Sequence, residues 1–173
     1  GNRARQLGKP YTRKNKSCVG CGQPGQAADL KALRKICDEH KLVLITDGAH
    51  SIGTFYDGKP TGSIADMTTF SFHPVKTVTA GEGGAVMTDS DELYKRLVLF
   101  SKHGITRNPD WPENVPDGPW YYEKIELGYN YRMTDIPAAL LISQLDKLET
   151  FKARRKEIVN RHKETFSRIP QQM

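Results

Sequence analysis

Lys76 lies in a setting where a lysine side chain could act as a nucleophile. The stretch SFHPVKTVTAGEGGAVMTD (71–89) places this lysine between an apolar run, MTTFSF (67–72), and a glycine cluster, GEGG (81–84). A lysine amine attacks carbonyl groups and forms Schiff bases. An amine placed just beyond a buried strand, beside a loop built largely from backbone, is therefore a candidate for covalent chemistry.

An acidic residue occupies the equivalent place on a second apolar run. Asp47 ends the segment KLVLITD (41–47), and in α/β sheets sites form at the carboxyl ends of the strands. Alone, Asp47 is typical of a turn and Lys76 of a solvated charge. Together they suit pyridoxal phosphate, which a lysine tethers while an acid keeps its pyridine nitrogen protonated. Ser71 and the GEGG turn could donate hydrogen bonds to the phosphate.

The elements that must position these residues follow from periodicity and turn signals. Apolar residues at helical spacing predict a helix over 28–40, and short apolar runs predict strands. Asp57-Gly58 predicts a hairpin turn, and Ser90 followed by two acids predicts the start of a helix that Gly104 stops. The remaining predicted elements are strands at 41–47, 67–72 and 84–89, a loop over 105–120, and one very long helix from Thr134 to Ile169. This order indicates an α/β fold.

Composition restricts the class of protein. The chain has 173 residues, with 37% hydrophobic and 27% charged residues, which is enough for one globular domain with a core. It contains no run of 18 apolar residues and no signal peptide, and its three cysteines do not suit a secreted disulfide framework. A cytoplasmic location without a membrane span is therefore expected. The first residue is Gly1, so we expect a piece of a longer protein.

The basic charge is concentrated at the N-terminus. Six of the 26 Lys and Arg residues lie within residues 1–17, which hold no acid. The other 20 balance the 20 acidic residues, so the net charge of +6 belongs to this segment. Such a segment is more often solvated than a specific binding arm, which argues against nucleic acid as a partner.

Three ordered blocks resemble one enzyme family. ITDGAHSIG (45–53), FSFHPVKTVTAGEGGAVMTD (70–89) and LGYNYRMTDIPAAL (127–140) are similar to the hallmark blocks of the DegT-type (DegT/StrS) sugar aminotransferases. The resemblance covers roughly residues 20–169. It implies the large domain of a fold-type I enzyme that depends on pyridoxal phosphate. FHPVK is most similar to the branch that makes 4-amino-6-deoxy sugars for surface glycans.

The resemblance assigns a role to individual residues. Lys76 would be the Schiff-base lysine and the proton carrier, Asp47 the partner of the pyridine nitrogen, and His50 the residue beside the cofactor ring. Ser71 would bind the phosphate, and Asn130 would reach the phosphate of the partner subunit's cofactor. A homodimer with shared active sites is therefore implied. Arg132 and His73 would face the sugar or serve packing, and Glu82 has no assigned chemistry.

The implied reaction transfers an amino group in two halves. The donor, expected to be glutamate, gives its amine to the cofactor, and a 4-keto-6-deoxy nucleotide sugar then accepts it. A lysine at position 76 favours transamination, since the family's dehydratases have histidine there. Gly48 stands where alanine is usual.

The resemblance also implies a division of the chain. Residues 1–17 would be a tail outside the family's pattern, 18–150 part of the cofactor-binding large domain, and 151–173 a helix leading to a C-terminal small domain. The family's N-terminal phosphate contacts and ring-stacking aromatic have no counterpart in the tail. We therefore expect weak activity from these 173 residues alone.

Two alternatives remain open. Cys18, Cys21, Cys37 and His40 have the spacing C-x2-C-x15-C-x2-H, which fits a zinc site and, with the basic tail, a nucleic-acid-binding module. Against this, Gly20, Gly22, Gln23 and Pro24 resemble a loop of the aminotransferase family that binds no metal. The second alternative is an inactive fragment of the aminotransferase.

Overall fold

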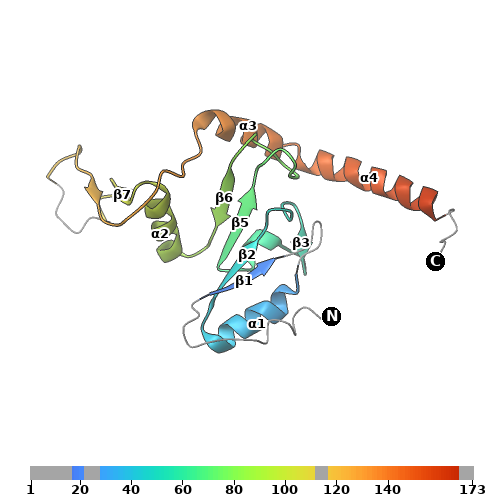
Figure 1. The fold of residues 1–173 in the computed structure, drawn as a ribbon, viewed down its shortest axis with the longest axis horizontal. Coiled ribbons are helices and arrows are strands. Elements are labelled where there is room, and N and C mark those ends of the chain that lie inside the picture. Colours follow the sequence, from blue (N-terminus) through green and yellow to red (C-terminus); the bar gives the residue numbers. More distant parts are fainter. Residues whose placement is uncertain (1–16, 22–27, 112–116, 168–173) are drawn as a thin grey trace.

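The centre of the molecule is a four-stranded mixed sheet. The computed structural model describes residues 17–21, 28–111 and 117–167 (Figure 1). The strands are β1 (Ser17–Cys21), β2 (Val43–Asp47), β5 (Met67–Ser71) and β6 (Gly84–Met87), in the spatial order β1-β2-β5-β6. The first three are parallel, and β6 runs antiparallel to β5. The predicted α/β fold is confirmed, although the sequence did not indicate β1.

Helix α1 (Leu30–His40) covers one face of β1 and β2 and closes a small core. Asp29 begins the helix by accepting a hydrogen bond from the Ala32 N–H (3.1 Å), which satisfies one of the amides left open in the first turn. The core lies between α1 and β2, and it consists of Leu30, Leu33, Cys37, Leu42 and Leu44. Cys37 and Leu44 are fully buried, so this interface anchors β2 against the helix.

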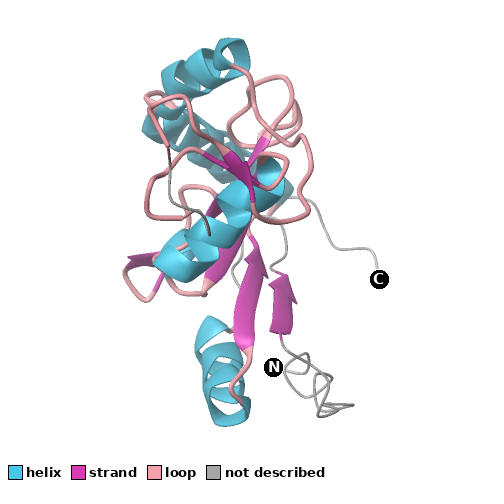
Figure 2. Cartoon of the chain, turned by 90° about the vertical axis from the view of Figure 1, so that its left-hand side faces the viewer, coloured by secondary structure: helices cyan, strands magenta, loops and turns pink. Residues whose placement is uncertain are grey.

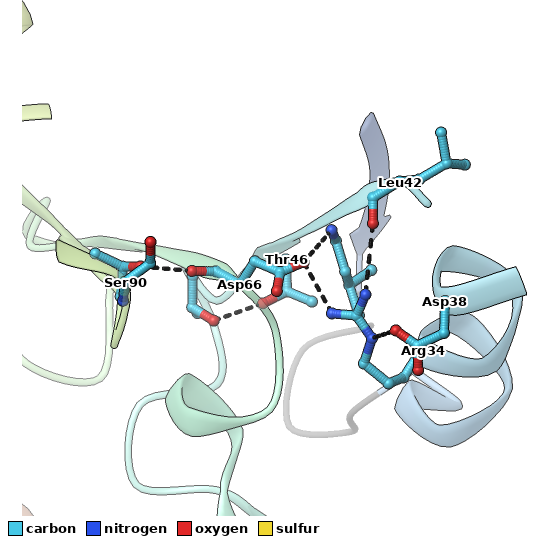
Figure 3. A network of polar contacts seen from close by, with 9 residues as sticks. Arg34, Asp38, Leu42, Thr46, Asp66 and Ser90 are labelled. Atoms are coloured by element: carbon cyan, nitrogen blue, oxygen red, sulfur yellow. Dashed lines mark hydrogen bonds and ion pairs between the residues drawn. The ribbon is translucent and has the colours of Figure 1, made fainter. Parts of the chain in front are cut away.

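A polar network fixes how β2, β5 and α1 meet (Figure 3). The Asp66 carboxylate, just before β5, accepts hydrogen bonds from the Leu44 N–H (2.6 Å) and from Arg34 Nη1 (2.8 Å). Arg34 also donates to Asp38 from Nε (2.8 Å). Partial burial opposes ionisation of Asp66, but the hydrogen bonds from Arg34 and Leu44 outweigh it and lower the pKa of this carboxyl. Asp66 therefore ties the start of β5 to β2 and α1.

Shorter elements flank the sheet. β3 (Phe55–Tyr56) and β4 (Lys59–Pro60) form the predicted hairpin, in which Asp57 and Gly58 both have positive φ (49° and 76°) as a tight turn requires. A 3-10 turn, η2 (Thr61–Ser63), follows. Ser90 caps α2 (Asp91–Ser101) as predicted, and Gly104 (φ 70°) ends it by donating to the Leu99 carbonyl (2.7 Å). β7 (Ile105–Thr106), at the start of the segment predicted as a loop, pairs antiparallel with β8 (Glu123–Lys124) beyond its end.

The single long helix predicted from Thr134 is wrong. The structure has two helices, α3 (Asp135–Leu145) and α4 (Leu148–Phe166). At the break, the Lys147 N–H bonds to the Gln144 carbonyl three residues earlier (3.1 Å), a tighter turn that interrupts the α-helical ladder. Neither proline nor glycine marks this break, so the sequence pattern continues across it.

Helices α3 and α4 lie at the opposite end of the molecule from α1. Figure 1 shows them extending beyond the tips of β5 and β6, and Figure 2 shows α1 at the lower end of the chain with the other helices above. Within the described residues, no helix is both long and apolar enough to cross a membrane.

Replacing Asp66 with Asn should destabilise the fold. The neutral amide loses the charge-assisted bonds to Arg34 and Leu44, which should cost about 1–3 kcal/mol at pH 7 for this partly exposed group. Asp38→Asn is the matched control, since Asp38 pairs with the same arginine on an exposed helix surface, and it should cost no more than about 0.5 kcal/mol. Urea unfolding monitored by circular dichroism measures both.

The effect of Asp66 should depend on pH in a defined direction. Because folding lowers the pKa of Asp66, its contribution is present above the unfolded pKa of about 4 and is lost as the pH falls through the folded pKa. The stability difference between wild type and Asp66→Asn should therefore shrink below about pH 4. A difference that stays constant down to pH 2, or grows, would contradict this origin.

Candidate active site

Asp47 and Ser71 lie on the same face of the sheet. β2 and β5 pair in parallel with Asp47 opposite Thr69, and Ser71 follows two residues later on β5. Opposed residues of neighbouring strands share a face, as do residues two apart along one strand. Thr46 and Thr68 consequently point to the other face, where their hydroxyls hydrogen bond (2.7 Å). The structure thus brings the predicted carboxylate and hydroxyl to one side and one end of the sheet.

The loop after β5 presents Lys76. Phe72 closes its base: its N–H donates to the Gly83 carbonyl (2.9 Å), and its carbonyl accepts from the Ala80 N–H (3.0 Å). Phe72, Val78 and Ala80 are buried, so their side chains anchor the loop, whereas Val75 at its tip is 74% exposed. The Lys76 N–H donates to the His73 carbonyl (3.0 Å). Lys76 therefore lies on a short loop between β5 and β6 that is held by these hydrogen bonds and buried side chains.

The Lys76 amine contacts His50. Its Nζ lies 2.9 Å from His50 Nε2. A charged ammonium has only N–H donors, so in that form the amine would donate this hydrogen bond and His50 Nε2 would accept it. His50 belongs to the turn that follows β2, in which Asp47 accepts from the Ala49 N–H (2.9 Å). The structure thus joins the loop of Lys76 to the loop that begins with Asp47.

Gly48 lies in close contact with strand β5 at the start of the turn that carries His50. Its N–H donates to the Thr69 carbonyl (2.7 Å), and a Cβ at this position would lie 2.9 Å from the same oxygen and 2.8 Å from the Phe70 ring. No side chain fits there without movement of the β5 backbone. A glycine at position 48 therefore matches a tight contact between β2 and β5.

Other polar residues on the Lys76 loop make longer contacts with one another. The Ser71 hydroxyl accepts from the His73 N–H (3.4 Å), and His73 Nε2 lies 3.9 Å from Glu82 Oε1. Glu82, for which the sequence suggested no chemistry, thus lies near His73 at the other end of the Lys76 loop. Both side chains are exposed.

Asn130 lies on a different part of the chain. It forms a backbone bridge with Lys102 at the end of α2, and its Oδ1 accepts from Arg132 Nε (3.0 Å). The rings of Phe100, Tyr129 and Tyr131 pack around this bridge, with the two tyrosines stacked at 5.2 Å. Neither of these two contacts joins Asn130 to Lys76, His50, Asp47 or Ser71. Its predicted role at a partner subunit's cofactor stays a prediction.

The residues around Lys76 fit pyridoxal phosphate. The cofactor requires an amine for its aldehyde, an acid for its ring nitrogen and donors for its phosphate. Lys76, Asp47 and Ser71 are of these types, and the paired ends of β2 and β5 place Asp47 and Ser71 at one edge of the sheet. His50 adds a ring nitrogen within hydrogen-bond reach of the amine.

Two of the four residues of the zinc hypothesis have different surroundings. Cys37 is completely buried in the apolar core of α1 and β2, whereas His40 at the end of α1 is exposed. Cys18 and Cys21 lie on β1. Among the residues whose side chains the structure describes, no group of three or more His, Cys, Asp or Glu residues is placed to hold a metal.

Sequence comparison decides which family these loops belong to. Residues 7–173 match the profile of the DegT/DnrJ/EryC1/StrS aminotransferases. The chain belongs to this family. The match begins inside the basic N-terminal segment, whose residues 1–16 lie outside the described part of the structure.

Individual relatives resemble this chain in sequence and in fold. The chain is 37% identical over 144 residues to UDP-4-amino-4,6-dideoxy-N-acetyl-beta-L-altrosamine transaminase of Campylobacter jejuni, covering 83% of this chain and 36% of that protein. Its fold matches Helicobacter pylori PseC, an aminotransferase of pseudaminic acid biosynthesis, with a TM-score of 0.85 at 29% identity, over 96% of this chain and 43% of PseC. The PLP form of Streptococcus pneumoniae Spr1654 gives a TM-score of 0.81 at 31% identity, over 96% of this chain and 45% of that one. The chain therefore spans less than half the length of these relatives.

The sequence did not reveal one neighbour of the site. Arg155 of α4 donates from Nη1 and Nη2 to the Thr77 carbonyl (3.3 Å each), directly after Lys76. The two residues are 78 positions apart, and a basic residue on a highly charged helix is ordinarily a solvated one. No local pattern indicates this contact.

Val78→Ala should loosen the loop that carries Lys76. Val78 is 1% exposed, and removing two methyl groups from this position should cost about 1–3 kcal/mol. Val75→Ala removes the same atoms from a side chain that is 74% exposed and should cost less than about 0.5 kcal/mol. Thermal unfolding, with hydrogen exchange at the amides of Lys76 and Ala80, checks both. Equal effects of the two variants would show that Val78 does not anchor the loop.

Proposed function

We propose that the protein transfers an amino group from an amino acid, glutamate, to a 4-keto-6-deoxy nucleotide sugar for surface glycan biosynthesis, using pyridoxal phosphate. The observation that carries the proposal is the Lys76 amine, held 2.9 Å from His50 on a loop beside the strand ends that bear Asp47 and Ser71. The names of the Campylobacter and Helicobacter relatives support the substrate class. The PLP form of the Streptococcus protein supports the cofactor.

Each side chain has a distinct task in the proposed reaction. Bound at this site, pyridoxal phosphate would supply an aldehyde and an electron-accepting ring. Lys76 would hold the cofactor and then move a proton from the α carbon of the donor through its Nζ. Asp47 would keep the pyridine nitrogen protonated, and Ser71 would donate to the phosphate. His50 would orient the amine when Lys76 is not engaged.

Part of each pocket would come from a second subunit. Asn130 is exposed at the end of α2, away from the Lys76 loop's own contacts, and would complete the phosphate site of a second subunit. The protein would then work as a homodimer, with this chain forming part of the large cofactor-binding domain. Arg132, which donates to the Asn130 side chain, would keep that amide oriented.

Reductive trapping tests the role of Lys76. The purified protein is incubated with pyridoxal phosphate, reduced with borohydride and digested, and mass spectrometry locates the labelled lysine. The label should fall on Lys76, and Lys76→Ala should reduce total incorporation by about tenfold or more because other amines lack the site. Lys59→Ala removes an exposed lysine of β4 and should leave incorporation unchanged. Labelling spread evenly over many lysines in all three proteins would refute the assignment.

Asp47→Asn tests the acid and should separate binding from chemistry. The amide retains the size of Asp47 but cannot hold a proton on the ring nitrogen, so trapping at Lys76 should persist. Amine transfer from glutamate to a 4-keto nucleotide sugar, followed by mass spectrometry in single-turnover reactions, should fall by about 10²-fold or more. Asp57→Asn, in the β3–β4 turn, is the control and should match wild type. Unchanged transfer by Asp47→Asn would remove Asp47 from the proposal.

A further inference from the structure

Helix α4 contacts the loop of Lys76 through one arginine. Both terminal nitrogens of Arg155 lie 3.3 Å from the Thr77 carbonyl, and the guanidinium carbon lies 5.7 Å from the Phe151 ring centroid. The adjacent Arg154 instead pairs with Glu157 on the same helix (2.7 Å). Two neighbouring arginines of one helix thus have different partners. Arg154 pairs within α4, whereas Arg155 hydrogen bonds to another part of the chain.

The same helix also contacts the loop of His50. A Cβ at Gly53 would lie 3.1 Å from Lys152 Cδ and 3.2 Å from Leu148 Cδ2, so these two side chains pack directly on the backbone of that loop. Lys152 Nζ also lies 5.7 Å from the ring centroid of Phe55. Gly53 has φ of 75°, a conformation that favours glycine and lets the loop turn beneath the helix.

These contacts place α4 across both sides of the Lys76–His50 hydrogen bond. Leu148 and Lys152 rest on the loop that carries His50, and Arg155, two turns after Leu148, holds the loop that carries Lys76. Leu148, Lys152 and Arg155 lie within about two turns of one helix, so a single element contacts both loops. A planar guanidinium suits the contact with Thr77, because its two terminal nitrogens donate to one carbonyl oxygen in a defined orientation.

We propose that Arg155 is a positioning residue for Lys76. Through the Thr77 carbonyl it holds the loop so that the Lys76 amine stays at His50, in the place from which it reacts. The catalytic purpose of this positioning rests on the proposed function, whereas the positioning itself is a property of the folded chain and can be measured without cofactor.

Competitive acetylation of lysines tests the positioning directly. The protein is treated with trace acetic anhydride, and mass spectrometry compares the labelling of Lys76 with that of Lys59, an exposed internal reference. In Arg155→Ala the half-buried Lys76 amine should be released from His50 and should label faster relative to Lys59. The expected increase is about twofold to tenfold, the factor that one hydrogen bond contributes to an equilibrium.

Two further variants make the result specific. Arg154→Ala removes the same charge from the next position of α4 and should label like wild type, because Arg154 has its partner on the helix itself. Arg155→Lys keeps the charge without the two-pronged donor and should lie between wild type and Arg155→Ala. If Arg155→Ala unfolds, as circular dichroism would reveal, Arg155→Lys alone carries the comparison. Labelling of Lys76 equal to that in Arg154→Ala, or a uniform rise at all lysines, would overturn the proposal.

A second readout links positioning to the proposed chemistry. The rate at which pyridoxal phosphate becomes trapped on Lys76 should fall about twofold to tenfold in Arg155→Ala and not in Arg154→Ala. Failure of wild type to trap the cofactor at all would count against the proposed function and leave the acetylation result valid. Normal trapping in wild type with unchanged acetylation in Arg155→Ala would count against the positioning role alone.

Discussion

The candidate site depends on the register between two parallel strands. β2 and β5 are locked by the buried Thr46–Thr68 hydroxyl pair (2.7 Å) and by the bond from the Gly48 N–H to the Thr69 carbonyl (2.7 Å). At the other end, the Asp66 carboxylate accepts from the Leu44 N–H. Because side chains alternate along a strand, a slip of one residue would turn Asp47 to the α1 face. The register therefore decides which face of the sheet carries the acid.

A second constraint concerns the contact that orients the lysine. Among the described residues, the Lys76 amine has the His50 ring as a hydrogen-bond partner (2.9 Å). His50 lies in the turn that follows β2, in which the Ala49 N–H donates to the Asp47 carboxylate. The orientation of the Lys76 amine therefore depends on both the loop after β5 and the turn after β2.

The sequence predicted the parts of the site that have a local cause. Asp47 and Lys76 each follow a recognisable apolar run, and the carboxyl ends of neighbouring parallel strands meet by geometry. β1 was missed because SCVGC has few strand-forming residues and gains its structure from pairing with β2. The break between α3 and α4 was missed because Asp146 and Lys147 are both compatible with a helix. The contact from Arg155 to Thr77 was missed because tertiary packing alone brings them together.

Helices α3 and α4 expose apolar side chains. Neither helix buries a residue fully within the described chain, and apolar side chains such as Ile136 (85%) and Ile142 (65%) are largely exposed. Apolar patches of this kind mark contact surfaces. Val159 lies one turn beyond Arg155 on the same side of α4 and is 48% exposed. A surface that covered Val159 would therefore lie one helical turn from Arg155, the residue of α4 that donates to the Thr77 carbonyl.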